Sequence, residues 1–172
     1  MATPFHVEIV TPERTVYSGE ADEVSMRTDA GAIAFLAHHE DFIGAADVTV
    51  VRVTTPGGGD GTEHGGEVRL AVHGGFVHVD QDENSVRILA GVAELASEID
   101  VERARRALEA AEASEVAATP PPAAASGHDA ETGPVVVPPV GSLLAMLEPD
   151  APEAAAKRAR VRLDAAGAAA PT

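Results

Sequence analysis

The stretch Leu70–Glu115, LAVHGGFVHVDQDENSVRILAGVAELASEIDVERARRALEAAEASE, contains the change of pattern that decides the fold. Its first part alternates apolar with polar residues and predicts strands over 68–73, 76–80 and 84–90, the first two separated by a glycine pair. At Asp100 the period changes: its short side chain is suited to capping a helix, and strong helix formers follow it. The sequence therefore predicts a β-domain that leads directly into a helix.

Short strands separated by turn residues also fill the upstream part of the chain. Asp29–Gly31 is expected to turn a hairpin, and the glycine-rich run 56–66 is expected to form a mobile hairpin loop. The expected strands cover residues 5–10, 15–18, 23–28, 32–36 and 48–54. Strands of this length and spacing favour an antiparallel β-sandwich or flattened barrel, which we assign to residues 1–97.

The rest of the chain is expected to be helical, with one interruption. The first helix is assigned to 98–117, and a Pro/Ala-rich linker, in which proline density forbids helix, is assigned to 118–140. A second helical segment with a frayed tail fills 141–172, with Pro152 in the first turn of its main helix and a further short helix over 141–147. The predicted fold class is mainly β with an α appendage: an N-terminal antiparallel β-sandwich, then two C-terminal helices separated by the linker.

Composition limits the partners of the chain. The formal charge of −16 argues against nucleic acid as a partner, and no apolar run is long enough to insert directly into a membrane. There is no cysteine for thiol chemistry, and the N-terminus does not resemble a signal peptide, so we expect an intracellular protein. Residues 1–98 carry a net charge of −12 but residues 151–172 carry +2, so the basic tail should seek an acidic surface, either on its own β-domain or on a partner.

Both predicted helices have an apolar stripe made mostly of alanine. The stripes contain Val101, Ala104, Leu108 and Ala111 in the first helix, and Ala156, Ala159, Leu163 and Ala166 in the second. Burying so few methyl groups contributes only a few kcal/mol, at about 0.8 kcal/mol per methylene-sized group. We therefore expect a weakly docked helical arm that a partner or ligand can reposition.

Several segments together resemble one known family. Ile99-Asp100-x-x-Arg103-Ala104 at the helix start, the opening Phe5–Glu13, Tyr17-Ser18-Gly19 and the Gly31/His39 region are similar to the epsilon subunit of bacterial F-type ATP synthases. The resemblance covers residues 4–117 well and 141–166 loosely. The Pro-rich insert is a departure, because the two helices of the family are joined by a short turn.

The resemblance implies a non-catalytic rotor subunit of the central stalk. Its partners would be the gamma subunit, the membrane c-ring and the catalytic-head subunits, and it would lie peripherally at the cytoplasmic face of the cell membrane. Its helical arm would be able to inhibit ATP hydrolysis. The alternative is a free-standing β-sandwich ligand-binding module with a disordered tail, which would not co-elute with gamma.

The resemblance also implies site residues. Asp100 and Arg103 match a segment that binds ATP in some members, where arginines of the second helix assist; here Arg158, Arg160 or Arg162 would do so. The simpler interpretation is that Asp100 only caps the helix and that Arg103 is solvated.

Partner contacts are implied for two further places. His39 corresponds to a loop histidine that faces the membrane ring, although the flanking Pro and Gly of the family are absent here. The basic residues of the second helix would face the catalytic head: Lys157, Arg158, Arg160 and Arg162. No arrangement of residues predicts a catalytic site or a metal site, and ATP as a regulatory ligand is the one cofactor considered.

Overall fold

The computed structural model describes residues 3–57, 64–118 and 152–168. Eight strands precede the helices: β1 (Phe5–Val10), β2 (Thr15–Ala21), β3 (Glu23–Thr28), β4 (Gly31–Phe35), β5 (Phe42–Pro56), β6 (His64–Asp80), β7 (Ser85–Ala90) and β8 (Ala93–Leu95). A short 3-10 helix, η1 (Ala96–Glu98), leads into α1 (Val101–Ala118), and α3 (Pro152–Ala165) follows. The expected linker at 118–140 and the short helix at 141–147 lie almost wholly outside the described residues.

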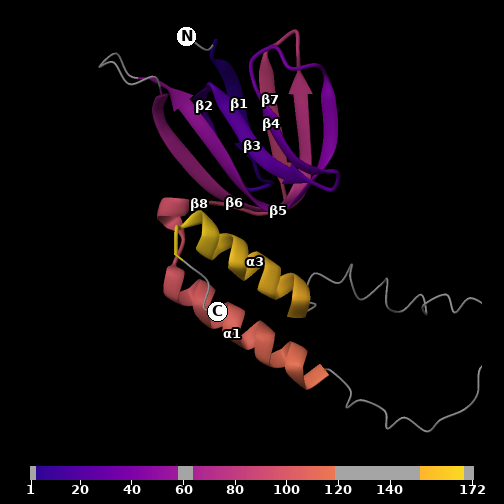
Figure 1. Cartoon of the computed structure of the whole chain (residues 1–172), viewed down its shortest axis with the longest axis vertical. Helices are drawn as coiled ribbons and strands as arrows, with labels where there is room; N and C mark the ends of the chain where they lie inside the picture. Colours follow the sequence, from indigo (N-terminus) through magenta and orange to yellow (C-terminus); the bar gives the residue numbers. More distant parts are fainter. Residues whose placement is uncertain (1–2, 58–63, 119–151, 169–172) are drawn as a thin grey trace, which may run out of the picture.

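The strands form one sheet that folds over into two layers (Figure 1). One layer, the β7 layer, contains β2, β1, β7 and the neighbouring halves of β6 and β5. The other, the β3 layer, contains β4, β3, β8 and the remaining halves of the same two long strands. The pairing of β1 with β7 is parallel, and the other strand pairs of the described chain are antiparallel.

The prediction of two separate strands around Gly74 and Gly75 is wrong. β6 runs through both glycines without ending, and it bends there because Gly74 has a φ of 82° and Gly75 a φ of 145°. A Cβ on Gly75 would lie 2.1 Å from the carbonyl oxygen of Leu89, so a side chain cannot be accommodated at this position. The glycine pair therefore lets β6 pass from one layer to the other.

Mostly aliphatic side chains fill the space between the layers, since the chain has only four Phe, one Tyr and no Trp. Along β7, Val86 and Ile88 are buried whereas Arg87 and Leu89 are exposed, which is the alternation of a strand with one face on a core. The largest fully buried side chains of the sandwich include Phe5, Phe35, Ile9, Leu70 and Ile88.

The helices lie on the outer face of the β3 layer. α3 packs directly on β5 and β6, and α1 packs antiparallel on the far side of α3 (Figure 1). The predicted stripes meet in one cluster of Ala104, Leu108, Ala111, Ala156, Ala159 and Leu163, whereas Ala166 contacts the β3 layer instead. No helix of the described chain has the length and apolar character needed to cross a membrane.

Candidate functional site

The start of α1 has the geometry that its sequence predicts. The backbone N–H of Arg103 donates to Oδ1 of Asp100 at 2.9 Å, so Asp100 caps the helix. The Arg103 side chain is exposed and makes no ion pair with the described residues. Capping is therefore confirmed for Asp100, and the guanidinium of Arg103 is available to a ligand.

A pocket of about 320 Å³ lies between the start of α1, β8 and α3. It brings Asp100, Arg103 and Arg162 together, which are three of the residues that the resemblance implies for ATP. Glu94 and Glu98 line the same pocket, so its side chains include three carboxylates and two guanidinium groups. The carboxylates outnumber the guanidinium groups, and this negative charge would repel a polyphosphate unless one carboxylate is displaced.

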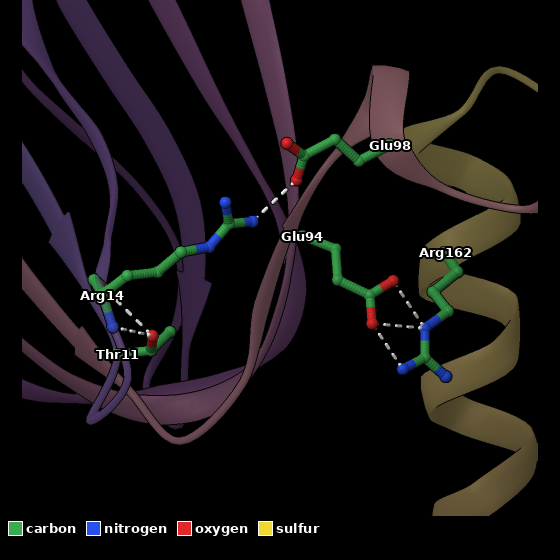
Figure 2. Close-up of polar contacts among 5 residues, drawn as sticks. All are labelled: Thr11, Arg14, Glu94, Glu98 and Arg162. Atoms are coloured by element: carbon green, nitrogen blue, oxygen red, sulfur yellow. Dashed lines mark hydrogen bonds and ion pairs between the residues drawn. The ribbon is translucent and has the colours of Figure 1, made fainter.

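Glu94 already holds the guanidinium of Arg162. Nη2 of Arg162 donates to Oε1 of Glu94 at 2.7 Å and Nε donates to Oε2 at 3.0 Å, a bidentate pair that Figure 2 shows beside the Arg14–Glu98 pair. The hydrogen bond from Arg162 lowers the pKa of Glu94, against the opposing effect of burial. Glu94 thus occupies the fork of Arg162 that a phosphate would use.

The other basic residues of α3 also face this chain. Nζ of Lys157 lies 2.6 Å from Oδ1 of Asp47 at the bend of β5, and Nη2 of Arg160 lies 2.8 Å from Oε1 of Glu112 on α1. Burial raises the pKa of Asp47, but the hydrogen bond and charge of Lys157 outweigh it and the pKa is lowered. The sequence left two acidic surfaces open for the basic tail, the chain's own β-domain or a partner. In this conformation the basic residues pair with acidic residues of the chain itself.

His73 lies under α3 on the outer face of the β3 layer. Its Nε2 is buried and has no hydrogen-bond partner in the described chain. Burial, with the nearby charges of Arg162 and Arg158, lowers the pKa of His73 to about 4, although Glu94 acts in the opposite direction. Sequence reasoning did not assign this histidine to the helix interface, because its partners come from segments far along the chain.

His39 lies in the loop between β4 and β5, half-buried. Its ring packs edge-on against Phe35, with centroids 5.1 Å apart, and its Nδ1 donates to the carbonyl oxygen of Glu40 at 2.8 Å. The neighbouring His38 N–H donates to Oδ1 of Asn84 at 2.8 Å, which ties this loop to the turn before β7. The ring of His39 therefore orders the loop, and exposed neighbours such as Leu36 are better placed to meet a partner.

An apolar row crosses the outer face of the β7 layer, and sequence reasoning missed it. Val10, Leu89, Phe76 and Ala45 are consecutive cross-strand neighbours on β1, β7, β6 and β5, and Ile43 lies two residues along β5. Phe76 is 61% exposed, Leu89 47% and Ile43 75%. The alternation with buried Val77 and Ile88 was the available signal, because it turns Phe76 and Leu89 outward.

This row differs from the other outer face of the sandwich. No described helix covers the β7 layer, whereas α3 covers the β3 layer. Adjacent exposed aromatic and aliphatic side chains on a sheet face are typical of a surface that binds another protein. The described chain thus has one face closed by its own helices and one face open.

Comparison with known proteins identifies the family. The model of the ATP synthase, Delta/Epsilon chain, beta-sandwich domain matches residues 4–96. The ATP synthase epsilon chain of Streptomyces griseus is 45% identical over 111 residues, which are 64% of this chain and 82% of the relative. That of Thermobifida fusca is 49% identical over 107 residues, which are 62% of this chain and 73% of the relative.

Solved structures agree with the fold. A chain of the Euglena gracilis mitochondrial ATP synthase structure, OSCP/F1/c-ring in rotational state 1, aligns with a TM-score of 0.54 at 25% identity over 64% of each chain. A chain of the Tetrahymena thermophila mitochondrial ATP synthase central stalk/c-ring aligns with a TM-score of 0.50 over 96% of this chain and 98% of the other, and at 12% identity this supports the fold alone. The chain belongs to the ATP synthase epsilon chain family.

Proposed function

We propose that this chain is the epsilon-type subunit of the central stalk of a bacterial F-type ATP synthase. In this role it is a non-catalytic rotor subunit, peripheral at the cytoplasmic face of the membrane, with the gamma subunit, the c-ring and the catalytic head as partners. The observation that carries the proposal is the difference between the two outer faces of the sandwich. A rotor subunit needs a lasting attachment to its shaft, and the open apolar face of the β7 layer can provide it.

The apolar row is the surface we assign to the gamma subunit. Permanent interfaces are more apolar than transient ones, and their central anchors are often aromatic. Phe76 lies in the middle of the row, between Leu89 and Ala45 on the adjacent strands. The loop that contains His39 lies beyond one end of β5, and we assign it to the c-ring.

The experiment that tests this assignment is co-elution with gamma on a gel-filtration column. The wild-type chain is expected to co-elute, and Phe76→Asp, which places a charge at the centre of the row, is expected to elute alone. Val92→Asp is the matched control, because Val92 is an exposed aliphatic residue in the turn after β7, outside the row. If Phe76→Asp co-elutes like the wild type, the row is not the interface. If the wild type fails to co-elute, a free-standing ligand-binding module becomes the better interpretation.

The helical arm is the part we assign to regulation. The basic residues Lys157, Arg158, Arg160 and Arg162 would exchange their present partners for acidic residues of the catalytic head when α3 leaves the β3 layer. Deletion of residues 140–172 should then leave assembly intact and raise the rate of ATP hydrolysis by the complex. An unchanged rate would mean that the arm is not a brake in this enzyme.

ATP is the ligand that the family resemblance suggests for the pocket at the start of α1. Arg103, Arg162 and Asp100 support this assignment, but Glu94 has to release Arg162 first, so we expect weak binding. Equilibrium dialysis with millimolar ATP tests it, with Arg103→Gln as the variant that should bind less. Absence of bound ATP at that concentration would exclude ATP sensing.

A further inference from the structure

The arginines of the sandwich divide into two groups. Residues 1–98 contain only five basic side chains among 17 acidic ones, and all five are arginines. Three of them pair with carboxylates: Arg14 with Glu98 at 2.8 Å, Arg87 with Glu8 at 3.0 Å, and Arg69 with Glu67 and Asp164, each at 3.6 Å. Arg27 and Arg52 have no carboxylate within ion-pair distance among the described residues. In so acidic a domain, two unpaired arginines require an explanation.

The two unpaired arginines are neighbours on one surface. Arg52 on β5 is the cross-strand partner of Ser25 on β3, and Arg27 lies two residues further along β3 on the same outer face. Arg52 is also directly opposite Arg69 on β6. Like charges placed opposite each other destabilise a sheet. Glu23 on β3 and Glu67 on β6 lie on the same face, diagonally across from Arg52, so acidic and basic side chains are mixed there.

The end of α3 adds one more carboxylate, Asp164, to this face. Asp164 reaches Arg69, which has a buried Nε without a hydrogen-bond acceptor in the described chain. Nothing on α3 forms an ion pair with Arg27 or Arg52, although Asp164 lies at the edge of the same surface. The charge of Arg27 helps to lower the pKa of Asp47, but neither Arg27 nor Arg52 forms an ion pair with a carboxylate of the described chain, so both guanidinium groups are open to a ligand.

A groove gives an external ligand access to both side chains. It has a volume of about 500 Å³, within the range of small-molecule sites, and it lies between β3, β4, β5 and Asp164 of α3. Arg27 and Arg52 line it together with small or apolar residues such as Ala32, Ala34 and Val50. The pocket that contains Arg103 lies on the other flank of α3, beside β8, so the two sites are separate.

We propose that Arg27 and Arg52 form an oxyanion site that binds the phosphate group of a small molecule. Guanidinium forks suit phosphate because each can donate two parallel hydrogen bonds to its oxygens. The phosphate can come from inorganic phosphate or from a nucleotide. Asp164 weakens the site by repulsion, which links occupancy to the position of α3. This proposal is independent of the function assigned to the apolar row and to the pocket at the start of α1.

Isothermal titration calorimetry of the full chain with inorganic phosphate, and then with ADP, tests the site. The double variant Arg27→Gln/Arg52→Gln should bind phosphate at least about tenfold more weakly, since charge-assisted hydrogen bonds are lost. Arg14→Gln is the matched control, a surface arginine in another part of the sandwich, and it should bind like the wild type. Asp164→Asn should bind severalfold more tightly because a repulsive charge is removed.

The outcomes separate the possibilities. Equal affinities for phosphate and ADP identify free phosphate as sufficient, and tighter binding of ADP identifies a nucleotide; either result supports the site. No saturable binding by the wild type at millimolar phosphate overturns it. So does a double variant that binds like the wild type, or binding that Arg103→Gln abolishes and the double variant retains. Circular dichroism checks that each variant is folded. If the double variant is unfolded, Arg27→Gln and Arg52→Gln are tested separately.

Discussion

The core of the sandwich and the interface between the two helices are built from different side chains. The sandwich buries Phe5, Phe35 and Ile88 among many valines, whereas the helix interface buries two leucines and a series of alanines. Buried apolar area sets most of the stabilisation, so the sandwich should be much the more stable part. The helices depend additionally on ion pairs to stay on the β3 layer, and ion pairs can be exchanged. The difference suggests that this chain combines a rigid attachment with a releasable arm.

The largest effect is expected in the core of the sandwich. Ile88→Ala removes a fully buried side chain and leaves a cavity, which should lower the free energy of unfolding by about 2–4 kcal/mol. Denaturant unfolding followed by circular dichroism measures this change. The control is Leu89→Ala on the exposed side of the same strand, which should cost less than about 0.5 kcal/mol. Equal losses for both variants would contradict the assigned core.

A smaller and local effect is expected at the helix interface. Leu108 is fully buried against α3, and Leu108→Ala should destabilise the arm by about 2 kcal/mol. Hydrogen exchange should then become faster in α1 and α3 while β6 and β7 keep their protection. If exchange in β6 becomes faster to the same extent, the helices and the sandwich unfold together. That result would contradict a stable sandwich with a separately releasable arm.

Acid should release the arm. The folded state holds His73 neutral down to its pKa of about 4, whereas the unfolded chain takes up a proton near its ordinary value of 6.5, so stability falls as the pH drops through this window. Glu94 and Asp47 have lowered pKa values, and their contribution is also lost as the pH falls. All three groups act in the same direction, and His73 should contribute most because its pKa shift is the largest.

Hydrogen exchange of α3 as a function of pH, corrected for the intrinsic pH dependence of exchange, measures this release. His73→Gln should shift the midpoint of α3 release to lower pH, because the destabilisation that comes from protonating His73 is removed. Protection of α3 that rises as the pH falls, or that does not change with pH, would contradict the assigned charges.

The smallest effects are expected from single ion pairs. Glu94→Gln breaks a bidentate, partly buried pair and should weaken docking of α3 by about 1–2 kcal/mol. Arg160→Gln breaks an exposed pair with Glu112 and should cost less than about 0.5 kcal/mol. The exchange rate of the α3 amides compares the two. If Arg160→Gln releases the arm as much as Glu94→Gln, the pair between α3 and β8 has no special role.

Much of the fold could be predicted from local patterns. Alternation along β7, the cap at Asp100 and the alanine stripes each depend on neighbouring residues, and all three are present in the structure. The continuity of β6 through Gly74 and Gly75 could not be predicted, because glycine breaks a strand in one context and bends it in another. Whether it bends depends on the partner strand: β7 leaves no space for a side chain at Gly75.

The candidate sites were predictable to a lesser degree. The residues Asp100, Arg103 and Arg162 were chosen through the resemblance, and the structure places them around one pocket. The partner of Arg162 was not predictable, because Glu94 is 68 residues away and lies on the short strand β8, which was not expected. The apolar row was also missed, since its members come from four strands and only the register brings them together.

Ion pairs and a small apolar cluster that includes Val50, Ala71 and Ala165 hold α3 on the β3 layer, and we expect α3 to be released while the sandwich stays folded. The chain has no cysteine, so spin labels can be attached at Glu13→Cys in the β1–β2 turn and Glu153→Cys on α3, both exposed positions. The distribution of distances between the labels should be single and narrow at neutral pH, and should shift and broaden in Glu94→Gln/Asp47→Asn while the β-sheet circular dichroism is unchanged. An unchanged distance in that variant, or a loss of sheet signal together with the change in distance, would contradict the account.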